Sequence, residues 1–256
     1  MVFFSANANQ GVVLGDVGRE LFMTDMASAS SPVTLVRDIA TGAVSSNPEY
    51  FEPMQGKMYF TADNGIAGRE LWRSDGTSIG TGLVTNIGFN ASSSGPTKKV
   101  SLGDKIYFTT TYDYSTKLWE SDGTHINSTV IYQSNTSIRD LSSQGGSLYF
   151  TTIDGTRIVL NKLDIHTGTV SNRGSINMSS ERSELIYAEA NNTVFYFIVN
   201  DSIYSHSDNG IHRIHSPTVE SSGIAGVVGK VFFVADYGYG MELMYHWYNP
   251  GPVISI

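Results

Sequence analysis

The sequence predicts an all-β fold in which short strands are grouped into stacked antiparallel sheets. The composition favours strands and turns, because only 16% of the 256 residues are charged while 11% are aromatic, and long surface helices prefer Glu, Lys and Ala. A short aromatic segment recurs six times along the chain. Two of these segments are followed in the chain by a Leu-Trp pair and then by Asp-Gly-Thr.

The aromatic segment defines six sequence repeats, whose spacing along the chain is about 37–56 residues. Its copies are VFFSA (2–6), MYFTA (58–62), IYFTT (106–110), LYFTT (148–152), VFYFI (194–198) and VFFVA (231–235). Large apolar residues are consecutive in these copies, which is typical of a strand covered on both faces. The repeats therefore start near residues 2, 58, 106, 148, 194 and 231.

Each repeat holds further strands around the aromatic one. A polar loop follows it, then a second strand such as RELWRSD (69–75), a turn, and a third strand such as GLVTNI (82–87). A segment such as PEYFEPM (48–54) precedes the aromatic strand and supplies a fourth. Four-stranded sheets of about 40–50 residues that stack radially form a β-propeller. We therefore expect residues 1–256 to form a single β-propeller domain.

The number of blades has two interpretations. The first copy, residues 1–39, has no strand before its aromatic segment, so six blades with an incomplete first blade are expected. Alternatively, five blades begin near residue 48, and the N-terminal repeat is a β-arm that pairs with its own ring or with a neighbouring subunit. Residues 179–192 are the one helical candidate, and their place in the repeat favours a strand.

The segment GRELWRSDGTSIGT (68–81) resembles the ELWxxDGTxxGT repeat of bacterial surface and secreted proteins. TKLWESDGTHINST (116–129) is similar but lacks the second Gly-Thr, and GRELFMTD (18–25) and GMELMYHW (240–247) keep only Gly and Glu-Leu. The resemblance implies a β-propeller that is usually exported, and it implies no defined activity.

The Asp-Gly-Thr segments are predicted to be turns between strands. They are Asp75, Gly76 and Thr77 in one repeat and Asp122, Gly123 and Thr124 in the next. Asp accepts hydrogen bonds from nearby backbone N–H groups, and Gly tolerates the positive φ that hairpin turns need. The alternative is a cation site, but calcium needs six or more oxygens and one such turn offers too few. No cofactor is expected, and calcium is the ion that repeated carboxylates would favour.

Two recurring carboxylate positions flank the loop between the aromatic strand and the next one. Asp63 and Asp236 follow the aromatic strand, and Glu70 and Glu242 precede the Leu of the second strand. In the structural interpretation, each carboxylate caps local backbone N–H groups. In the functional one, these loops point to one face of the ring and form an acidic ligand-binding funnel.

Aromatic residues at the Trp72 position of the second strand are expected to pack between blades. The C-terminal run YHWYNPG (245–251) looks least like a core strand. An exposed aromatic platform for ligands is therefore predicted at Tyr237, Tyr239, Tyr245, Trp247 and Tyr248.

Charge and hydropathy exclude some functions. The net charge of −8 repels phosphate backbones, so nucleic-acid binding is not expected. Cys is absent, which removes disulfides and thiolate metal sites, and no apolar run is long enough to insert into a membrane. No signal peptide is recognisable, so a secreted or cell-surface location implies a mature or trimmed chain.

These patterns favour an extracellular, non-catalytic recognition module that binds carbohydrate or a protein partner through loops on one face of the propeller. One alternative is a structural subunit of a cell-surface layer or filament, which would form homo-oligomers. The other is an enzyme such as a glycosidase or lyase, which needs two carboxylates within catalytic reach of each other.

Overall fold

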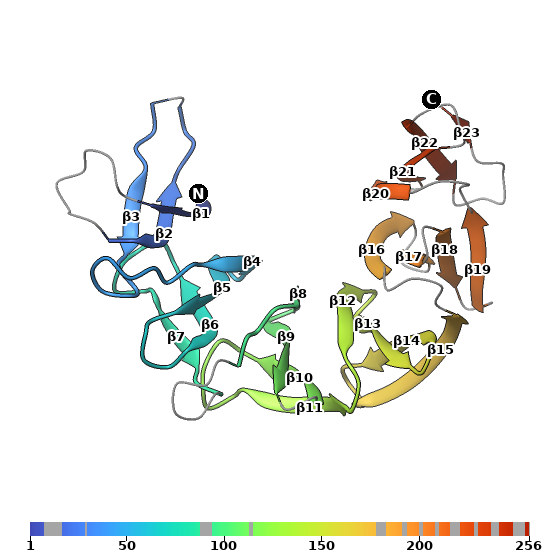
Figure 1. Ribbon diagram of the computed structural model, residues 1–256, viewed down its shortest axis with the longest axis horizontal. Coiled ribbons are helices and arrows are strands. Elements are labelled where there is room, and N and C mark those ends of the chain that lie inside the picture. Colours follow the sequence, from blue (N-terminus) through green and yellow to red (C-terminus); the bar gives the residue numbers. More distant parts are fainter. Residues whose placement is uncertain are drawn as a thin grey trace. The chain divides into compact units, whose positions relative to one another are not determined.

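The computed structural model is built from β-strands, and none of the residues it describes lies in a helix (Figure 1). The described residues are 1–7, 17–28, 30–87, 94–112, 115–177, 183–190, 194–199, 202–207, 210–215, 221–227, 230–236, 241–247 and 254–255. The prediction of an all-β fold is thereby confirmed. The helical candidate contains strand β16 (Ser183–Ala190), as its place in the repeat indicates.

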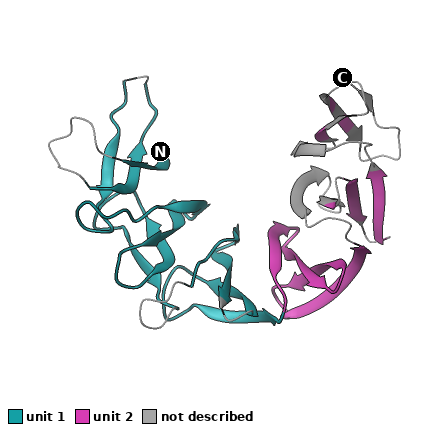
Figure 2. Cartoon of the chain, in the orientation of Figure 1, with its two compact units in different colours: residues 1–135 teal, residues 136–256 magenta. Residues whose placement is uncertain are grey.

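The strands belong to two compact units, residues 1–135 and 136–256 (Figure 2). The first unit contains β1 (Val2–Asn7), β2 (Arg19–Thr24), β3 (Thr34–Arg37), β4 (Glu49–Met54), β5 (Lys57–Asp63), β6 (Arg69–Ser74), β7 (Gly82–Thr85), β8 (Lys99–Leu102), β9 (Lys105–Tyr112), β10 (Ser115–Ser121) and β11 (Thr129–Ser134). The second contains β12 (Ile138–Gln144), β13 (Ser147–Asp154), β14 (Arg157–Asp164), β15 (Thr169–Asn177), β16, β17 (Val194–Val199), β18 (Ser202–Ser207), β19 (Gly210–His215), β20 (Ser221–Val227), β21 (Lys230–Asp236), β22 (Met241–Trp247) and β23 (Ile254–Ser255). The expectation of one domain over the whole chain stays a prediction.

The described strands form six antiparallel sheets, and each sheet contains strands that are consecutive in the chain. The first sheet is β1-β2-β3, and each of the other five has four strands. This grouping matches the six sequence repeats. The number of blades in a closed ring stays a prediction.

Five of the six recurring aromatic segments are the second strands of the four-stranded sheets, and the segments in β5, β9 and β13 are buried as their sequence predicts. Tyr59, Phe60, Tyr107, Phe108 and Phe150 are each at most 2% exposed. The neighbouring strands on both sides and the adjacent sheets remove these rings from water.

The hydrophobic cores lie between successive sheets within each unit. Leu21 and Val36 of the first sheet share one cluster with Phe60 and Trp72 of the second. Leu71 of the second sheet shares another with Phe108 of the third. In the second unit, Leu160 of β14 packs with Val199 of β17 in the same way. Each sheet therefore shelters its neighbour, which is why an isolated repeat would leave an apolar face in water.

A β-bulge recurs at the Leu-Trp step of the repeat. The register of the third and fourth strands shifts between Leu71 and Trp72, and again between Leu118 and Trp119. The first sheet has the same shift between Leu21 and Phe22. Such bulges increase the local twist of a strand pair.

Candidate functional site

The glutamate of the Glu-Leu-Trp element is a buried connector between sheets. Glu70 is fully buried at the start of β6, and its carboxylate accepts hydrogen bonds from Ile87 N (3.2 Å), Ser94 N (3.2 Å) and Ser94 Oγ (2.5 Å). The carboxylate therefore ties the segment between β7 and β8 to the end of the second sheet.

Glu20 does the same one repeat earlier. It accepts hydrogen bonds from Ile39 N (2.9 Å), Ser46 N (2.9 Å) and Ser46 Oγ (2.5 Å). Burial raises the pKa of the Glu20 carboxyl above its usual value, although the hydrogen bonds from Ser46 and Ile39 oppose that shift. The recurring glutamate thus has a structural explanation in both repeats where its side chain is described.

Asp63 lies at the end of β5, next to the segment between β3 and β4 that Glu20 binds. Its backbone N–H donates to Ser46 O (2.9 Å), and its carboxylate accepts from Gly65 N (2.7 Å). The structure therefore brings Asp63 and Glu70 to one end of the second sheet. Asp63 shapes the loop that follows it. Glu70 instead points toward the segment between β7 and β8.

The predicted C-terminal residues are described less fully. Asp236 and Glu242 lie opposite Met241 and Ala235 in the β21–β22 pair, and their side chains are outside the described part. Trp247 is opposite Lys230 in the same pair. Tyr237, Tyr239 and Tyr248 lie outside the described residues.

Tyr245 is the member of the predicted C-terminal platform whose side chain is described. Its ring is half-buried, with its centroid 5.9 Å from that of Phe232. The use of this aromatic group as a ligand platform stays a prediction.

The first Asp-Gly-Thr segment forms a turn that is closed by its own side chains. Asp75 Oδ1 accepts from Thr77 N (2.9 Å) and Thr77 Oγ1 (2.7 Å), and Gly76 adopts a φ of 92°. These bonds hold the pKa of Asp75 below its usual range. Ser74 Oγ and Thr81 Oγ1, 2.7 Å apart, join the two ends of the loop.

The second turn repeats this arrangement. Asp122 Oδ1 accepts from Thr124 N (2.9 Å) and Thr124 Oγ1 (2.6 Å), and Gly123 adopts a φ of 89°. Asn127 replaces the second glycine of the motif and donates to Asp122 Oδ2 (2.6 Å). Both loops therefore share the same bonds from Thr to the Asp side chain and the same positive φ at Gly.

The same turns also form contacts between sheets, which the sequence did not indicate. Arg73 of the second sheet donates to Gly123 O (2.9 Å) in the third. A Cβ placed on Gly123 would lie 2.1 Å from the Tyr59 hydroxyl oxygen, so the glycine lets that ring approach. Gly76 packs in the equivalent way against Met23 of the first sheet.

The predicted packing of the tryptophans is confirmed for Trp72 and Trp119, whose rings join the clusters between sheets. Trp119 Nε1 donates to Thr110 Oγ1 (2.9 Å). The residue equivalent to Thr110 in the preceding repeat is Ala62, and Trp72 Nε1 is buried without a hydrogen-bond partner. The repeat that has Ala62 in place of the threonine therefore lacks the hydroxyl that accepts the equivalent bond from Trp119.

The most distinctive exposed group lies at the same end of the second sheet as Asp63. We call it the Tyr50 face and define it by the following residues: Val44, Glu49, Tyr50, Ile66 and Arg69. Arg69 connects its two loops, because its guanidinium donates to Asn47 O (3.2 Å) and to Glu49 Oε2 (3.0 Å). Val44 and Ile66 are exposed aliphatic residues on those loops.

Tyr50 occupies an unusual backbone conformation. Its φ is 56°, in the left-handed region, and it lies where the β4–β5 register shifts between Glu49 and Glu52. Its side chain is 52% exposed. A bulky residue in this region costs free energy, and such strain persists only where the surrounding structure imposes it.

Lys99 on β8 packs beneath this tyrosine. Its ammonium nitrogen lies 5.1 Å from the centroid of the Tyr50 ring and donates to Thr61 Oγ1 (2.6 Å) and Pro96 O (3.0 Å). Burial, with the charge of Arg69 as a smaller cause, lowers the pKa of Lys99 to about 7. The lysine therefore supports the ring from the interior of the unit.

Sequence reasoning placed Tyr50 in an inner strand and did not single it out. Its bulge and positive φ depend on how β4 pairs with β5, which no local pattern reveals.

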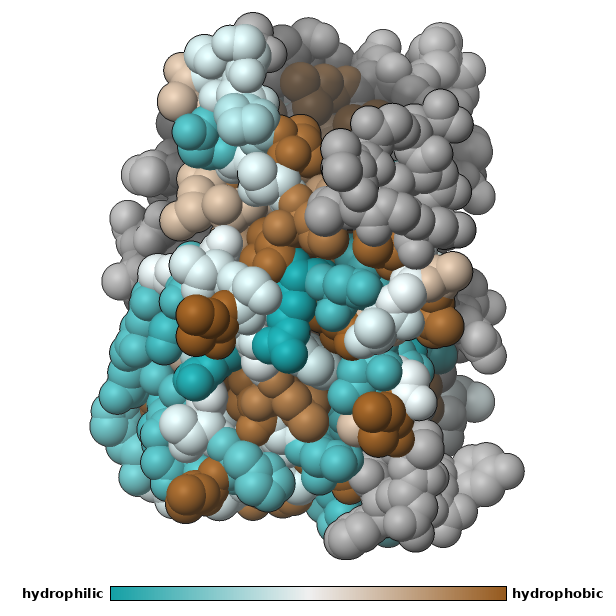
Figure 3. All heavy atoms as spheres, turned by 90° about the vertical axis from the view of Figure 1, so that its left-hand side faces the viewer, coloured by the Kyte–Doolittle hydropathy of each residue, from teal (hydrophilic) through white to brown (hydrophobic). Residues whose placement is uncertain are grey.

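Among the described residues, no three His, Asp or Glu side chains gather as metal ligands. Nor do those residues include a helix that is long and apolar enough to cross a membrane. Figure 3 shows one face of the molecule, on which apolar patches alternate with hydrophilic residues.

No known protein-family model matches the sequence, and no match was found among curated proteins. Solved structures do share the fold. A putative TolB from Agrobacterium tumefaciens is 13% identical with a TM-score of 0.52, and the match covers 88% of this chain and 83% of that one. A chain of a nidogen/laminin complex is 8% identical with a TM-score of 0.54, covering 96% and 88%. Puromycin hydrolase is 12% identical with a TM-score of 0.64, and the match covers 92% of this chain but only 41% of the hydrolase.

The sheet topology and these similarities together define the protein as a β-propeller. At such low identity, the similarities establish the fold alone. The specific ELWxxDGT repeat class stays a resemblance in the sequence.

Proposed function

We propose that this chain is a non-catalytic recognition module of an exported protein, and that it binds a protein partner through the Tyr50 face. The observation that carries the proposal is the half-exposed ring of Tyr50, held in a left-handed backbone conformation above Lys99. Conformational strain of this kind clusters at binding and active sites. A ring fixed in advance loses little conformational entropy when it binds.

The composition of the face favours a protein over a carbohydrate. Tyr and Arg are enriched at the energetic centres of protein interfaces, and Arg69 bonds here to Glu49, the residue that precedes Tyr50. Val44 and Ile66 add exposed aliphatic surface, 59% and 77% exposed respectively. Exposed aliphatic side chains suit an apolar protein surface better than the hydroxyl groups of a sugar.

Similar folds provide further support for a binding role. One similar structure is a TolB and another is part of a complex between nidogen and laminin. Puromycin hydrolase bears the name of an enzyme, but this chain spans less than half of it. The resemblance of residues 68–81 to repeats of bacterial surface and secreted proteins supports the proposal of export.

The proposal is tested by selecting protein ligands for the purified chain from a displayed peptide library and measuring their affinities by biolayer interferometry. Tyr50→Ala should weaken binding at least about tenfold, which corresponds to about 1.4 kcal/mol. Ile79→Ser is the matched control, because Ile79 is 99% exposed beyond the other end of β6 and should not affect binding.

Two results would contradict the proposal. Selected ligands that bind Tyr50→Ala as tightly as the unmodified chain would show that the face is not the site. Glycan-array binding that Tyr50→Ala abolishes, without any selected protein ligand, would assign the face to carbohydrate instead.

A further inference from the structure

The half-exposed ring of Tyr50 is supported by a group that can lose its charge. The Lys99 ammonium nitrogen lies 5.1 Å from the centroid of this ring. Among the described residues, no hydrogen bond and no second aromatic ring holds the Tyr50 side chain. An ammonium ion attracts the face of an aromatic ring electrostatically. The position of the ring therefore depends in part on the charge of Lys99.

Lys99 itself is anchored independently of Tyr50. Its amine donates to Thr61 Oγ1 (2.6 Å) and to Pro96 O (3.0 Å), and the Thr61 hydroxyl donates to the same Pro96 O. Thr61 and Pro96 are both buried. These two acceptors therefore fix the amine beneath the ring.

The two protonation states of the amine differ toward the ring but not toward these acceptors. An ammonium group has three N–H donors, so two can bond to Thr61 and Pro96 while the third is left for the ring of Tyr50. A neutral amine has two N–H groups and a lone pair. The two N–H groups keep the bonds to the acceptors, and the lone pair is left for the negative face of the ring. Loss of the proton therefore weakens the contact with Tyr50 and leaves the anchor of Lys99 intact.

Charged groups from two strands act on Lys99. Arg69 of β6 repels its charge, whereas Glu52 and Glu49 of β4 attract it. Both carboxylates are also engaged elsewhere, because Glu49 accepts from Arg69 and Glu52 Oε1 accepts from Ser101 N and Oγ (2.7 Å each). No carboxylate among the described residues is therefore reserved for Lys99.

The other strands packed against Lys99 present neutral side chains to it. Thr61 of β5 bonds to its amine, and Phe108 of β9 lies opposite it in the β8–β9 pair. Burial outweighs the attraction of the carboxylates and lowers the pKa of Lys99 to about 7. Both protonation states are therefore populated near neutral pH.

From these contacts we infer that the charge of Lys99 switches the Tyr50 face between two states. The ammonium form holds the ring against β8, and the neutral amine releases it to other rotamers. The inference rests on the proposed function for what the face does, and it adds the proton as the signal that regulates it. A released ring must be ordered again when a partner binds, so the face binds more tightly while Lys99 is charged.

The first test needs no partner, because it follows the Tyr50 side chain in the unbound 256-residue chain. Three-bond NMR couplings measure the χ1 rotamer populations of Tyr50 from about pH 5.5 to about pH 8.5, on both sides of neutrality. The ratio of held to released ring should fall about fivefold across this range, which corresponds to about 1 kcal/mol for a cation–π contact. The midpoint should coincide with that of the Cε carbon signal of Lys99.

Two substitutions fix the charge beneath the ring. Lys99→Met is neutral and Lys99→Arg is charged throughout this pH range. Lys99→Met should show the released rotamers at every pH, and Lys99→Arg should show the held rotamer at every pH.

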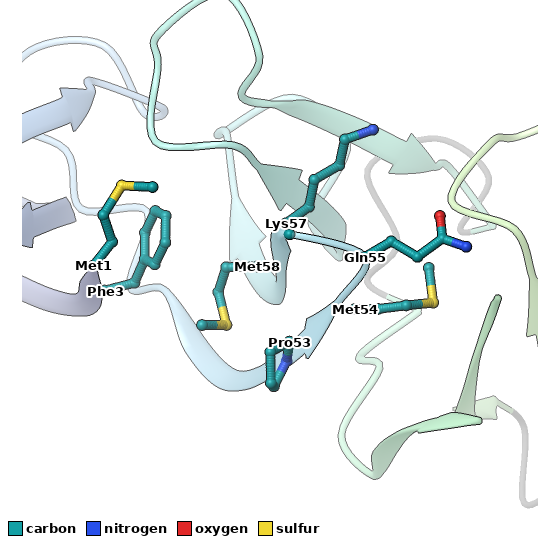
Figure 4. Close-up of a pocket in the computed structure, with 8 residues that line it drawn as sticks. Met1, Phe3, Pro53, Met54, Gln55, Lys57 and Met58 are labelled. Carbon is teal, nitrogen blue, oxygen red and sulfur yellow. The ribbon is translucent and has the colours of Figure 1, made fainter. Parts of the chain in front are cut away.

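A lysine on the same strand pair provides the matched control. Lys57 pairs with Met54 at the hairpin end of β4 and β5, roughly 13 Å along the strand from Tyr50. It lies beside a pocket of about 350 Å³ at that end of the sheet, and Figure 4 shows its amine directed away from Phe3 and Met58. Lys57→Met removes one positive charge without changing the contact beneath Tyr50, so it should leave the rotamer ratio within about twofold of that in the unmodified chain.

The second test uses the peptide ligands selected for the Tyr50 face. Their affinity for the unmodified chain should be up to about fivefold higher at about pH 6 than at about pH 8, and Lys99→Met should remove this dependence. Affinity that does not change with pH, for ligands that Tyr50→Ala weakens, would overturn the regulatory role of Lys99.

The rotamer measurement separates this inference from the proposed function. A ratio that stays constant while Lys99 titrates, or that changes equally in Lys99→Met, would overturn the inference even if ligands bind the face. If no protein ligand binds the face, the proposed function fails, and the rotamer ratio still decides whether Lys99 controls the ring. The unmodified chain provides this ratio by itself, so the result does not depend on the folding of any variant.

Discussion

Alanine substitution at the two turn glycines separates backbone strain from contact between sheets. Gly76 and Gly123 occupy equivalent positions with φ angles of 92° and 89°. Alanine at either position should cost about 1–2 kcal/mol, because L-residues are strained in the left-handed region. At Gly76 the nearest atom to a new Cβ is Met23 Sδ at 3.0 Å, at the flexible end of a side chain. The loss of stability in Gly76→Ala should therefore be close to the cost of the backbone strain alone.

Gly123→Ala adds a collision with a fixed ring. The new Cβ would lie 2.1 Å from the hydroxyl oxygen of Tyr59, which is only 2% exposed. Overpacking of a filled interior costs about 1–3 kcal/mol, so the free energy of unfolding should fall by about 1–3 kcal/mol more than in Gly76→Ala. Urea denaturation followed by tryptophan fluorescence measures both values.

The background variant Tyr59→Phe tests the cause of that difference. Without the hydroxyl, the nearest ring atom, Cζ, is 3.0 Å from the new Cβ, so part of the excess destabilisation should disappear. A double-mutant cycle measures this coupling. Equal destabilisation by Gly76→Ala and Gly123→Ala, with no coupling to Tyr59, would refute the argument that the turn is a contact between sheets.

Three further substitutions test the interior of the first unit. Ala62→Thr should supply the missing acceptor for Trp72 Nε1 and raise the free energy of unfolding by about 1 kcal/mol; a fall in the urea midpoint would mean that the hydroxyl does not fit. Glu70→Ala leaves three donors, two of them buried, without their carboxylate and should cost about 3 kcal/mol, more than the single side-chain bond lost in Ser94→Ala; equal urea midpoints would contradict this. The pKa of Lys99 is lowered to about 7, so between pH 7 and 10 the unfolded chain holds a proton that the folded chain has released. The free energy of unfolding should therefore rise with pH in this window, by at most about 1.4 kcal/mol per pH unit, and Lys99→Met should remove that contribution; an unchanged pH profile in Lys99→Met would refute it.

Local sequence patterns were sufficient to predict the strands and the turns. The aromatic segments in β5, β9 and β13 are buried strands because consecutive apolar residues need cover on both faces. Asp75 and Asp122 close their turns with bonds to the residue two positions later, which is a short-range effect of side-chain length and backbone geometry.

The proposed binding surface depends on contacts between residues far apart in the sequence. The recurring glutamate is a connector because Glu70 meets Ser94, 24 residues away, across the end of a sheet. Tyr50 acquires its positive φ from the way β4 pairs with β5 and its support from Lys99 on β8. The sequence by itself therefore determined the repeating strand unit, whose causes lie within a few residues. Only the tertiary structure decided which polar and aromatic side chains are enclosed between sheets and which remain available to a partner, because that depends on packing between repeats.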